Sequence, residues 1–112
     1  MKRTPIRAAF VAALFALAGC GGESSQPDSP VARGEKVYKN VCLACHAANP
    51  SDEGSLGPAI AGSSRELIEA RVVLGTYPEG YTPKRASQAM PKFPHLAGSV
   101  DDLAAYLAQF GD

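Results

Sequence analysis

The chain has 112 residues, a length that allows one folded domain. Its 11 basic and 11 acidic residues balance, and no stretch gathers basic residues, so we expect no nucleic-acid partner. The charges are distributed unevenly, because Lys2, Arg3 and Arg7 all precede the first acidic residue, Glu23. Removal of the N-terminal segment would therefore leave a mildly acidic protein. No internal repeat is visible.

The first 19 residues have the pattern of an export signal. A basic segment, residues 1–7, precedes the apolar run 8–18. This run is too short to span a bilayer but is typical of a secretory signal. It closes with Leu17-Ala18-Gly19-Cys20, which resembles the lipobox of bacterial lipoproteins. We therefore expect residues 1–19 to be a lipoprotein signal peptide and Cys20 to carry the lipid.

An ordinary secretory signal that leaves Cys20 free, or an uncleaved N-terminal helix, is the alternative to the lipobox. Acyl chains on Cys20 would anchor the protein to a membrane on the periplasmic side of the cell envelope. Gly21 follows Cys20, and by resemblance to Gram-negative lipoproteins it favours the outer membrane over the inner one. Residues 20–30 are rich in Gly, Ser and Pro and predict a flexible tether. The folded domain is predicted at 31–112.

The pattern after the tether predicts a first helix that leads into two closely spaced cysteines. Ser29 can cap this helix and Pro30 suits its first turn. Its inner face comprises Gly34, Val37, Tyr38 and Val41, at helical spacing. The next residues are Cys42-Leu43-Ala44-Cys45-His46.

This Cys-x-x-Cys-His string is typical of a site where haem c is attached covalently. The thiols of Cys42 and Cys45 would form thioethers with the porphyrin, and His46 would bind the iron. A spacing of three residues is about one helical turn, so both thiols point to the same side. Export agrees with this interpretation, because bacteria attach haem c outside the cytoplasmic membrane.

Three other uses of the string fit less well. A redox disulfide between Cys42 and Cys45 would favour a thioredoxin-like βαβ pattern, which the sequence lacks. A zinc site needs four ligands, and the available side chains are Cys42, Cys45, His46 and His95. The adjacency of Cys45 and His46 suits tetrahedral geometry poorly. A structural disulfide would leave His46 and Met90 without a role.

The remainder of the chain predicts two more helices separated by loops. Residues 47–62 and 76–95 are rich in Gly and Pro and predict loops. Ser63-Ser64-Arg65-Glu66 resembles a capping box that opens a second helix ending near Gly75. Its inner stripe is predicted as Leu67, Ala70 and Leu74, flanked by Ile68 and Val72.

A last helix is predicted from Ser99-Val100-Asp101-Asp102 to Gly111. Its inner face comprises Leu103, Tyr106, Leu107 and Phe110. No stretch alternates as a strand would, so the predicted fold class is all-α, with three to four short helices and long loops. A domain of roughly 80 residues is marginal on apolar burial alone, and a covalent haem would complete its core.

A sixth ligand for the iron is expected downstream of the string. Without the signal peptide, Met90 is the single methionine of the chain, and Ala89 and Pro91 place it in a loop. The alternative is that Met90 only fills the core. His95 competes with Met90 for the role of ligand. The alternative interpretation of His95 is a histidine on the surface of the loop.

The folded part resembles the class I c-type cytochromes, which carry one haem bound by His and Met. The resemblance rests on Gly34 and Tyr38 in the first helix and on Tyr106 in the last. It also rests on two loop motifs, Gly57-Pro58-Ala59-Ile60-Ala61-Gly62 and Met90-Pro91-Lys92-Phe93.

The resemblance implies the cytochrome c fold, in which the first and last helices cross closely at a glycine. It also implies that the Pro58 carbonyl accepts a hydrogen bond from Nδ1–H of His46. His46 and Met90 would be the axial ligands. The connection at 76–89 is longer than in compact members of the family.

Several polar side chains near these motifs have two interpretations. Arg71 interrupts the apolar stripe of the second helix, and either packs at its edge or binds a haem propionate. Lys84 and Arg85 have the same alternatives. Tyr77 and Tyr81 would hydrogen-bond a propionate or cover the haem.

These features predict a single-electron carrier that is tethered to a membrane and exchanges electrons with redox protein partners. We expect no small-molecule substrate and no enzymatic activity, because the sequence supplies neither a nucleophile nor a polar distal pocket. One alternative is a haem-based sensor or ligand-binding module, which would need Met90 to leave the iron. Another is a dedicated electron-transfer subunit of a membrane or periplasmic oxidoreductase.

Overall fold

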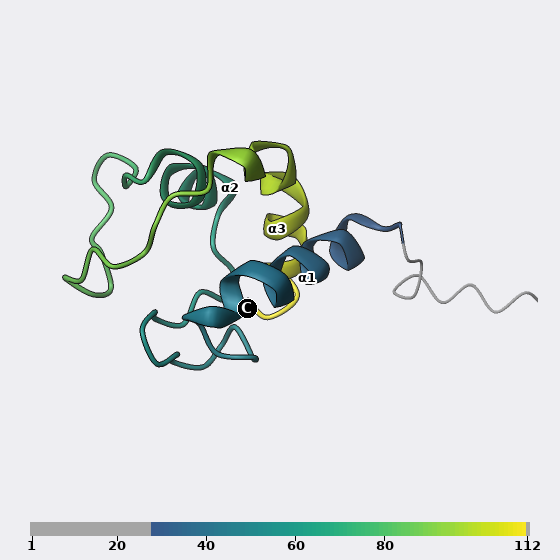
Figure 1. Cartoon of the computed structure of the whole chain (residues 1–112), viewed down its shortest axis with the longest axis horizontal. Helices are drawn as coiled ribbons and strands as arrows, with labels where there is room; N and C mark the ends of the chain where they lie inside the picture. The colour runs from purple at the N-terminus through teal and green to yellow at the C-terminus, as the bar shows by residue number, and fades with distance from the viewer. Residues whose placement is uncertain (1–27, 112) are drawn as a thin grey trace, which may run out of the picture.

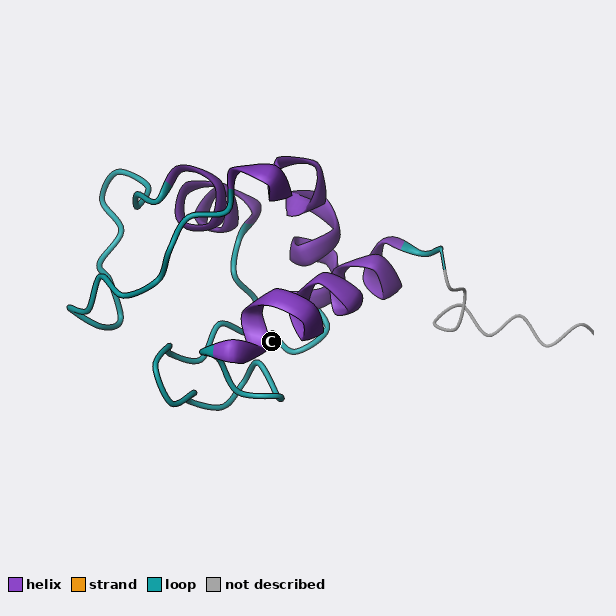
Figure 2. Ribbon diagram, viewed as in Figure 1, coloured by secondary structure: helices purple, strands orange, loops and turns teal. Residues whose placement is uncertain are grey.

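The computed structural model describes residues 28–111, which form helices joined by long loops (Figure 1). The expectations for the signal peptide, for Cys20 and for most of the tether therefore lie outside the described residues. Within 28–111 there is no strand, in agreement with the predicted all-α class (Figure 2). The α-helices are α1 (Pro30–Val41), α2 (Arg65–Ile68) and α3 (Val100–Leu107). Tighter or wider helical turns form η1 (Cys42–Ala44), η2 (Glu69–Leu74) and η3 (Pro94–Ser99).

In the part of the chain that the structure describes, no helix has both the length and the apolar character that crossing a membrane requires.

Helix α1 begins and ends where the sequence predicts. The Ser29 hydroxyl accepts a hydrogen bond from the Ala32 N–H at 3.1 Å, and Pro30 occupies the first turn. Gly34 and Tyr38 are buried, whereas Lys36 on the opposite side is exposed. The predicted inner face of this helix is therefore confirmed.

Helices α1 and α3 cross at Gly34, as the resemblance implied (Figure 1). A Cβ atom added to Gly34 would lie 2.0 Å from the Asp102 carbonyl oxygen and 2.8 Å from Cβ of Tyr106. One turn along each helix, the rings of Tyr38 and Tyr106 pack with centroids 5.4 Å apart. Arg33 closes the rim of this crossing through two 2.9 Å hydrogen bonds to the Asp102 carboxylate.

The second helical segment differs from the prediction at its start. Ser64 is the cap, and its hydroxyl accepts a hydrogen bond from the Leu67 N–H at 3.1 Å. The capping box beginning at Ser63 is therefore wrong by one residue. Ser63 instead donates from its hydroxyl to the Ile60 carbonyl at 2.7 Å, which ties the preceding loop to the helix start.

The inner stripe predicted for this segment is also partly wrong. After Ile68 the chain widens into the π-helix η2, which ends at Gly75 in the left-handed conformation, with φ 71°. Because a π turn bonds residue i to i+5, the residues after Ile68 lose the spacing of an α-helix. Ala70 and Val72 remain buried, but Leu74 is 60% exposed instead of facing the core.

The last helix, α3, continues directly from the helical turn η3 and has no side-chain cap at its start. Ser99 makes no side-chain capping bond, because η3 already winds the chain from Pro94 into α3. The predicted cap is therefore wrong, as is the loop prediction for Pro94 and His95. Helix α3 ends at Leu107, before Gly111. The core of the described residues comprises Tyr38, Ile68, Val72, Leu96, Val100, Leu103, Tyr106 and Leu107.

Candidate functional site

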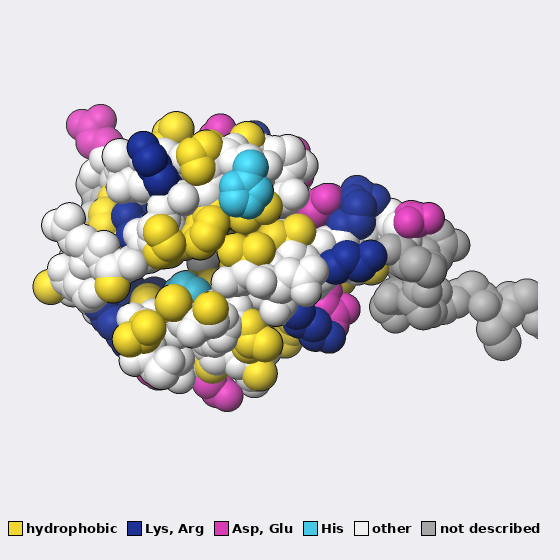
Figure 3. All heavy atoms as spheres, in the orientation of Figure 1, with side chains coloured by type: hydrophobic (Ala, Val, Ile, Leu, Met, Phe, Trp, Pro, Cys, Tyr) yellow, Lys and Arg dark blue, Asp and Glu magenta, His cyan; other side chains and the backbone are white. Residues whose placement is uncertain are grey.

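A cavity of about 520 Å³ lies between the loop at 47–62 and the segments α2, η2 and η3. Figure 3 shows a hollow on this face with hydrophobic side chains along its walls. All five residues that the sequence assigned to the folded site line this cavity: Cys42, Cys45, His46, Pro58 and Met90. The fold thus brings together side chains that are up to 48 positions apart in the chain.

The two cysteines reach the cavity through a tight turn at the end of α1. The N–H groups of Cys45 and His46 both donate to the Cys42 carbonyl, at 3.1 and 2.9 Å. Both thiols are free and partly buried. Burial raises the pKa of the Cys42 thiol to about 11.

His46 is held by the loop at 47–62, which we call the proximal loop. Its Nδ1 lies 2.8 Å from the Pro58 carbonyl oxygen, the contact that the resemblance implied. With the proton on Nδ1, the ring donates to this carbonyl and keeps a lone pair on Nε2 for a metal. The Cys45 carbonyl accepts from the N–H groups of Leu56 and Gly57, at 3.2 and 3.0 Å. These bonds fix the loop directly on the cysteine motif.

Met90 reaches the same cavity from a loop, as predicted, and it is partly buried. Three residues later, the Phe93 N–H donates to the Val72 carbonyl at 2.5 Å, which ties this loop to η2. His95 also lines the cavity, but its side chain is exposed, and its ring lies edge-on to Phe93. The cavity therefore contains a thioether and an imidazole from the segment 90–95.

Arg71 lies at the cavity wall and stacks on an aromatic side chain. Its guanidinium carbon is 4.2 Å from the centroid of the Tyr77 ring, and Tyr77 in turn stacks on Tyr81 at 5.5 Å. All three side chains line the cavity. The sequence did not decide whether these residues bind a propionate or cover the haem. In the structure the three side chains stack in series along one wall of the cavity.

Lys84 and Arg85 hydrogen-bond the proximal loop. The Lys84 ammonium donates to the Ala59 carbonyl at 2.6 Å. Arg85 donates to the Glu53 carboxylate at 2.6 Å and to the Gly54 carbonyl at 3.2 Å. No sequence pattern predicts these contacts, because Glu53 and Arg85 are 32 positions apart and belong to irregular segments.

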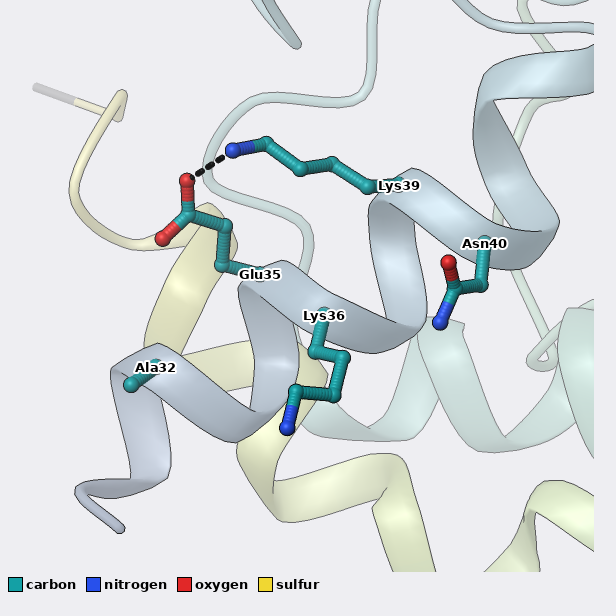
Figure 4. Close-up of a pocket in the computed structure, with 5 residues that line it drawn as sticks. All are labelled: Ala32, Glu35, Lys36, Lys39 and Asn40. Atoms are coloured by element: carbon teal, nitrogen blue, oxygen red, sulfur yellow. Dashed lines mark hydrogen bonds and ion pairs between the residues drawn. The ribbon is translucent and has the colours of Figure 1, made fainter. Parts of the chain in front are cut away.

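Two other kinds of site come into question within the described residues, a metal-ion site and a second hollow. Residues 28–111 hold no group of three or more His, Cys, Asp or Glu side chains placed to bind a metal ion, so a zinc site has no ligand set there. A shallow hollow on the outer face of α1 is lined by Ala32, Glu35, Lys36, Lys39 and Asn40 (Figure 4). Within it the Lys39 ammonium already pairs with the Glu35 carboxylate at 2.5 Å.

The large cavity fits a covalently bound haem. Its walls are mainly apolar, and the groups that suit haem attachment and iron binding are the two thiols, an imidazole held through Nδ1 and a thioether. A model of the family described as cytochrome c oxidase, cbb3-type, subunit III matches residues 29–107. The chain belongs to this family of c-type cytochromes. It is a class I c-type cytochrome with the small helical fold of that class, and it binds haem c covalently.

The match covers α1, the cysteine motif, the proximal loop, the loop that carries Met90 and all of α3. A search of curated proteins found no match for this cytochrome.

Proposed function

We propose that this cytochrome carries single electrons, with Cys42 and Cys45 forming the thioethers and His46 and Met90 binding the iron. The observation that supports this most directly is the convergence of these four side chains on one largely apolar cavity. When bound, haem c supplies one-electron chemistry by cycling between its ferric and ferrous states. The family match supports haem-based electron transfer in general.

The protein sets the electron-transfer properties through its own contacts. The Pro58 carbonyl orients His46 and increases the electron density on its imidazole. The Met90 thioether favours the ferrous form, which gives a higher reduction potential than a second histidine would. Two side-chain ligands leave no position for a substrate, which supports a carrier and not an enzyme.

The apolar wall has a separate role, which is to exclude water from the cavity. It includes the buried side chains of Ile68, Val72, Leu96, Leu103 and Leu107. A packed wall holds the ligands in nearly the same positions in both redox states, so little rearrangement opposes electron transfer. Contacts with redox protein partners would be small and short-lived, as is usual for such encounters.

We also propose that Cys20 is lipidated and holds the cytochrome at a membrane on the periplasmic side of the envelope. This rests on the lipobox-like sequence, and Gly21 favours the outer membrane. Residues 20–30 would serve as the tether. Restricting the domain to a membrane surface raises its effective concentration near membrane-bound partners.

A second candidate function is a dedicated electron-transfer subunit of a membrane or periplasmic oxidoreductase. The description of the matching family, an oxidase subunit, favours this candidate. Isolation of the cytochrome from its native membrane distinguishes the two functions. A free carrier is recovered alone, whereas a dedicated subunit is recovered in stoichiometric association with one oxidoreductase.

One spectroscopic experiment tests the carrier proposal against a sensor. A carrier shows the weak near-infrared band of methionine bound to ferric iron, and its reduced form binds carbon monoxide slowly. Rapid carbon monoxide binding together with the absence of that band would indicate an open iron site. This result would exclude the low-spin carrier and favour a ligand-binding module.

A further inference from the structure

The segment that precedes Met90 is attached to the rest of the protein at few points. We call residues 76–89 the strap. It follows Gly75, which caps the end of η2, and it leads directly into Met90 (Figure 1). Its first part is fixed by the stack of Arg71, Tyr77 and Tyr81 at the cavity wall. The second part of the strap, residues 82–89, has neither helix nor strand.

Two side chains hold this second part. Among the described residues, the hydrogen bonds from 82–89 to other parts of the protein come only from Lys84 and Arg85. Arg85 is the more enclosed end of its ion pair, since its side chain is 33% exposed and that of Glu53 is 65% exposed. The Arg85 guanidinium also lowers the pKa of the Glu53 carboxyl, so this pair is charged at neutral pH.

Both side chains bind the loop that orients His46. Arg85 reaches Glu53 and Gly54, and the Gly54 N–H donates to the Gly57 carbonyl at 2.9 Å. Lys84 binds the Ala59 carbonyl, next to Pro58, whose own carbonyl accepts from His46. The strap that precedes Met90 is thus joined directly to the loop that holds His46, and these two segments would supply the two ligands of the iron.

We propose that Arg85 and Glu53 are positioning residues that hold Met90 on the iron by tying the strap to the proximal loop. This inference rests on the proposed function, because it takes Met90 as the distal ligand. Arg85 is five residues before Met90, so release of the ion pair frees the segment between them. A freer segment lets Met90 leave the iron more often, which admits external ligands.

The test measures how fast imidazole displaces Met90 in the haem-loaded ferric protein. Arg85→Gln and Glu53→Gln should each speed imidazole binding by about two- to fivefold, the range expected for loss of an exposed charge pair. The charge-swapped variant, Arg85→Glu with Glu53→Arg, should return the rate toward that of the wild type. All of these variants should keep the near-infrared band, because Met90 still binds most of the time.

Arg65→Gln provides the matched control. Arg65 makes exposed ion pairs with Glu69 and Asp101 at 2.8 and 2.7 Å, and it does not line the cavity. A purely structural role for the Arg85–Glu53 pair would lower the thermal stability of Arg85→Gln and Arg65→Gln alike and leave the imidazole rate unchanged. Our proposal requires the rate to respond only at Arg85 and Glu53.

Three results would overturn the proposal. If Glu53→Gln binds imidazole at the wild-type rate while Arg85→Gln binds it faster, Arg85 acts through another group, such as a haem propionate. If neither variant changes the rate, the ion pair does not control Met90. If the wild type lacks the near-infrared band, Met90 is not the ligand and the proposed function fails together with this inference.

Discussion

Gly57 lies directly against the imidazole of His46. A Cβ atom at position 57 would come within 2.4 Å of His46 Cε1 and 2.6 Å of its Nδ1. Real Cβ atoms do not approach that closely, so only glycine permits the ring to occupy this position. The same ring donates through Nδ1 to the adjacent Pro58 carbonyl at 2.8 Å. Gly57 and the hydrogen bond to Pro58 therefore act together to orient the His46 ring.

The first prediction concerns Gly57→Ala. The added methyl group forces the His46 ring or the proximal loop to move, at a cost of about 1–3 kcal/mol in unfolding free energy. We expect a weaker hydrogen bond to Pro58 and a lower haem content per polypeptide. Absorption of the reduced haem, normalised to protein concentration, measures that content.

Gly98→Ala is the control for this substitution. Gly98 lies in η3, and an added Cβ there would meet no atom within 4 Å. This variant should retain the haem content and stability of the wild type. Equal behaviour of the two alanine variants would contradict the role assigned to Gly57.

The sequence predicted those features that depend on local pattern or on a short motif. The face of α1 followed from its spacing, and its cap from Ser29 and Pro30. The start of α2 was misplaced because two consecutive serines can each cap a helix, and only the backbone geometry selects Ser64. The exposure of Leu74 was missed because a π-helix leaves no signature in the spacing of apolar residues.

The sequence predicted the side chains that line the site better than the loop contacts that hold them in place. Cys42, Cys45, His46 and Met90 stand in motifs that can be recognised from the sequence, and the fold places them on one cavity. The contact of Gly57 with the His46 ring depends on how a loop folds over the cysteine motif. Such contacts between irregular segments have no periodicity, so only the structure reveals them.

The second prediction concerns the crossing of α1 and α3. Gly34→Ala would place a methyl group 2.0 Å from the Asp102 carbonyl oxygen, where backbone and not a flexible side chain must yield. We expect the helices to separate and the unfolding free energy to fall by about 1–3 kcal/mol, despite the better helix propensity of alanine. Urea unfolding followed by circular dichroism measures this change.

Lys36→Ala tests the same helix on its exposed face. Lys36 points into solvent beside the Glu35–Lys39 pair (Figure 4). Its replacement should change the unfolding free energy by less than about 0.5 kcal/mol. A loss as large as that of Gly34→Ala would show that the crossing is not the cause.

The third prediction is a pH dependence that arises from Tyr38. This side chain is fully buried, and its hydroxyl donates to the Ala47 carbonyl at 2.5 Å. Burial raises the pKa of Tyr38 from its ordinary value of 10 to about 12. Because the folded protein holds this proton more tightly than the unfolded chain, the stabilisation is complete below pH 10 and is lost as the pH rises through 12.

Urea unfolding at a series of pH values tests this dependence. The wild type should lose stability steeply above pH 10, whereas Tyr38→Phe should start about 1 kcal/mol less stable at neutral pH and then decline less. Tyr106 is the matched comparison, since burial also raises its pKa. An identical decline in wild type and Tyr38→Phe would assign the alkaline loss to other groups.

The fourth prediction concerns the membrane anchor. Cys20→Ala removes the thiol that would accept the lipid, so the cytochrome should move from the membrane fraction to the soluble periplasmic fraction. The haem spectrum should not change, because the folded domain and its ligands follow the tether. Fractionation with detection of the haem protein measures the distribution. Retention of Cys20→Ala on membranes would refute the lipid anchor.

The fifth prediction separates Met90 from His95 as the distal ligand. Met90→Ala should abolish the near-infrared band, lower the reduction potential and speed carbon monoxide binding, because the thioether no longer occupies the iron. His95→Ala should change none of these properties, since its side chain is exposed although it lines the same cavity. The double variant should match Met90→Ala in carbon monoxide binding. Faster binding in the double variant than in Met90→Ala would instead show that His95 takes the vacated position. An unchanged band and reduction potential in Met90→Ala would exclude Met90 as the ligand.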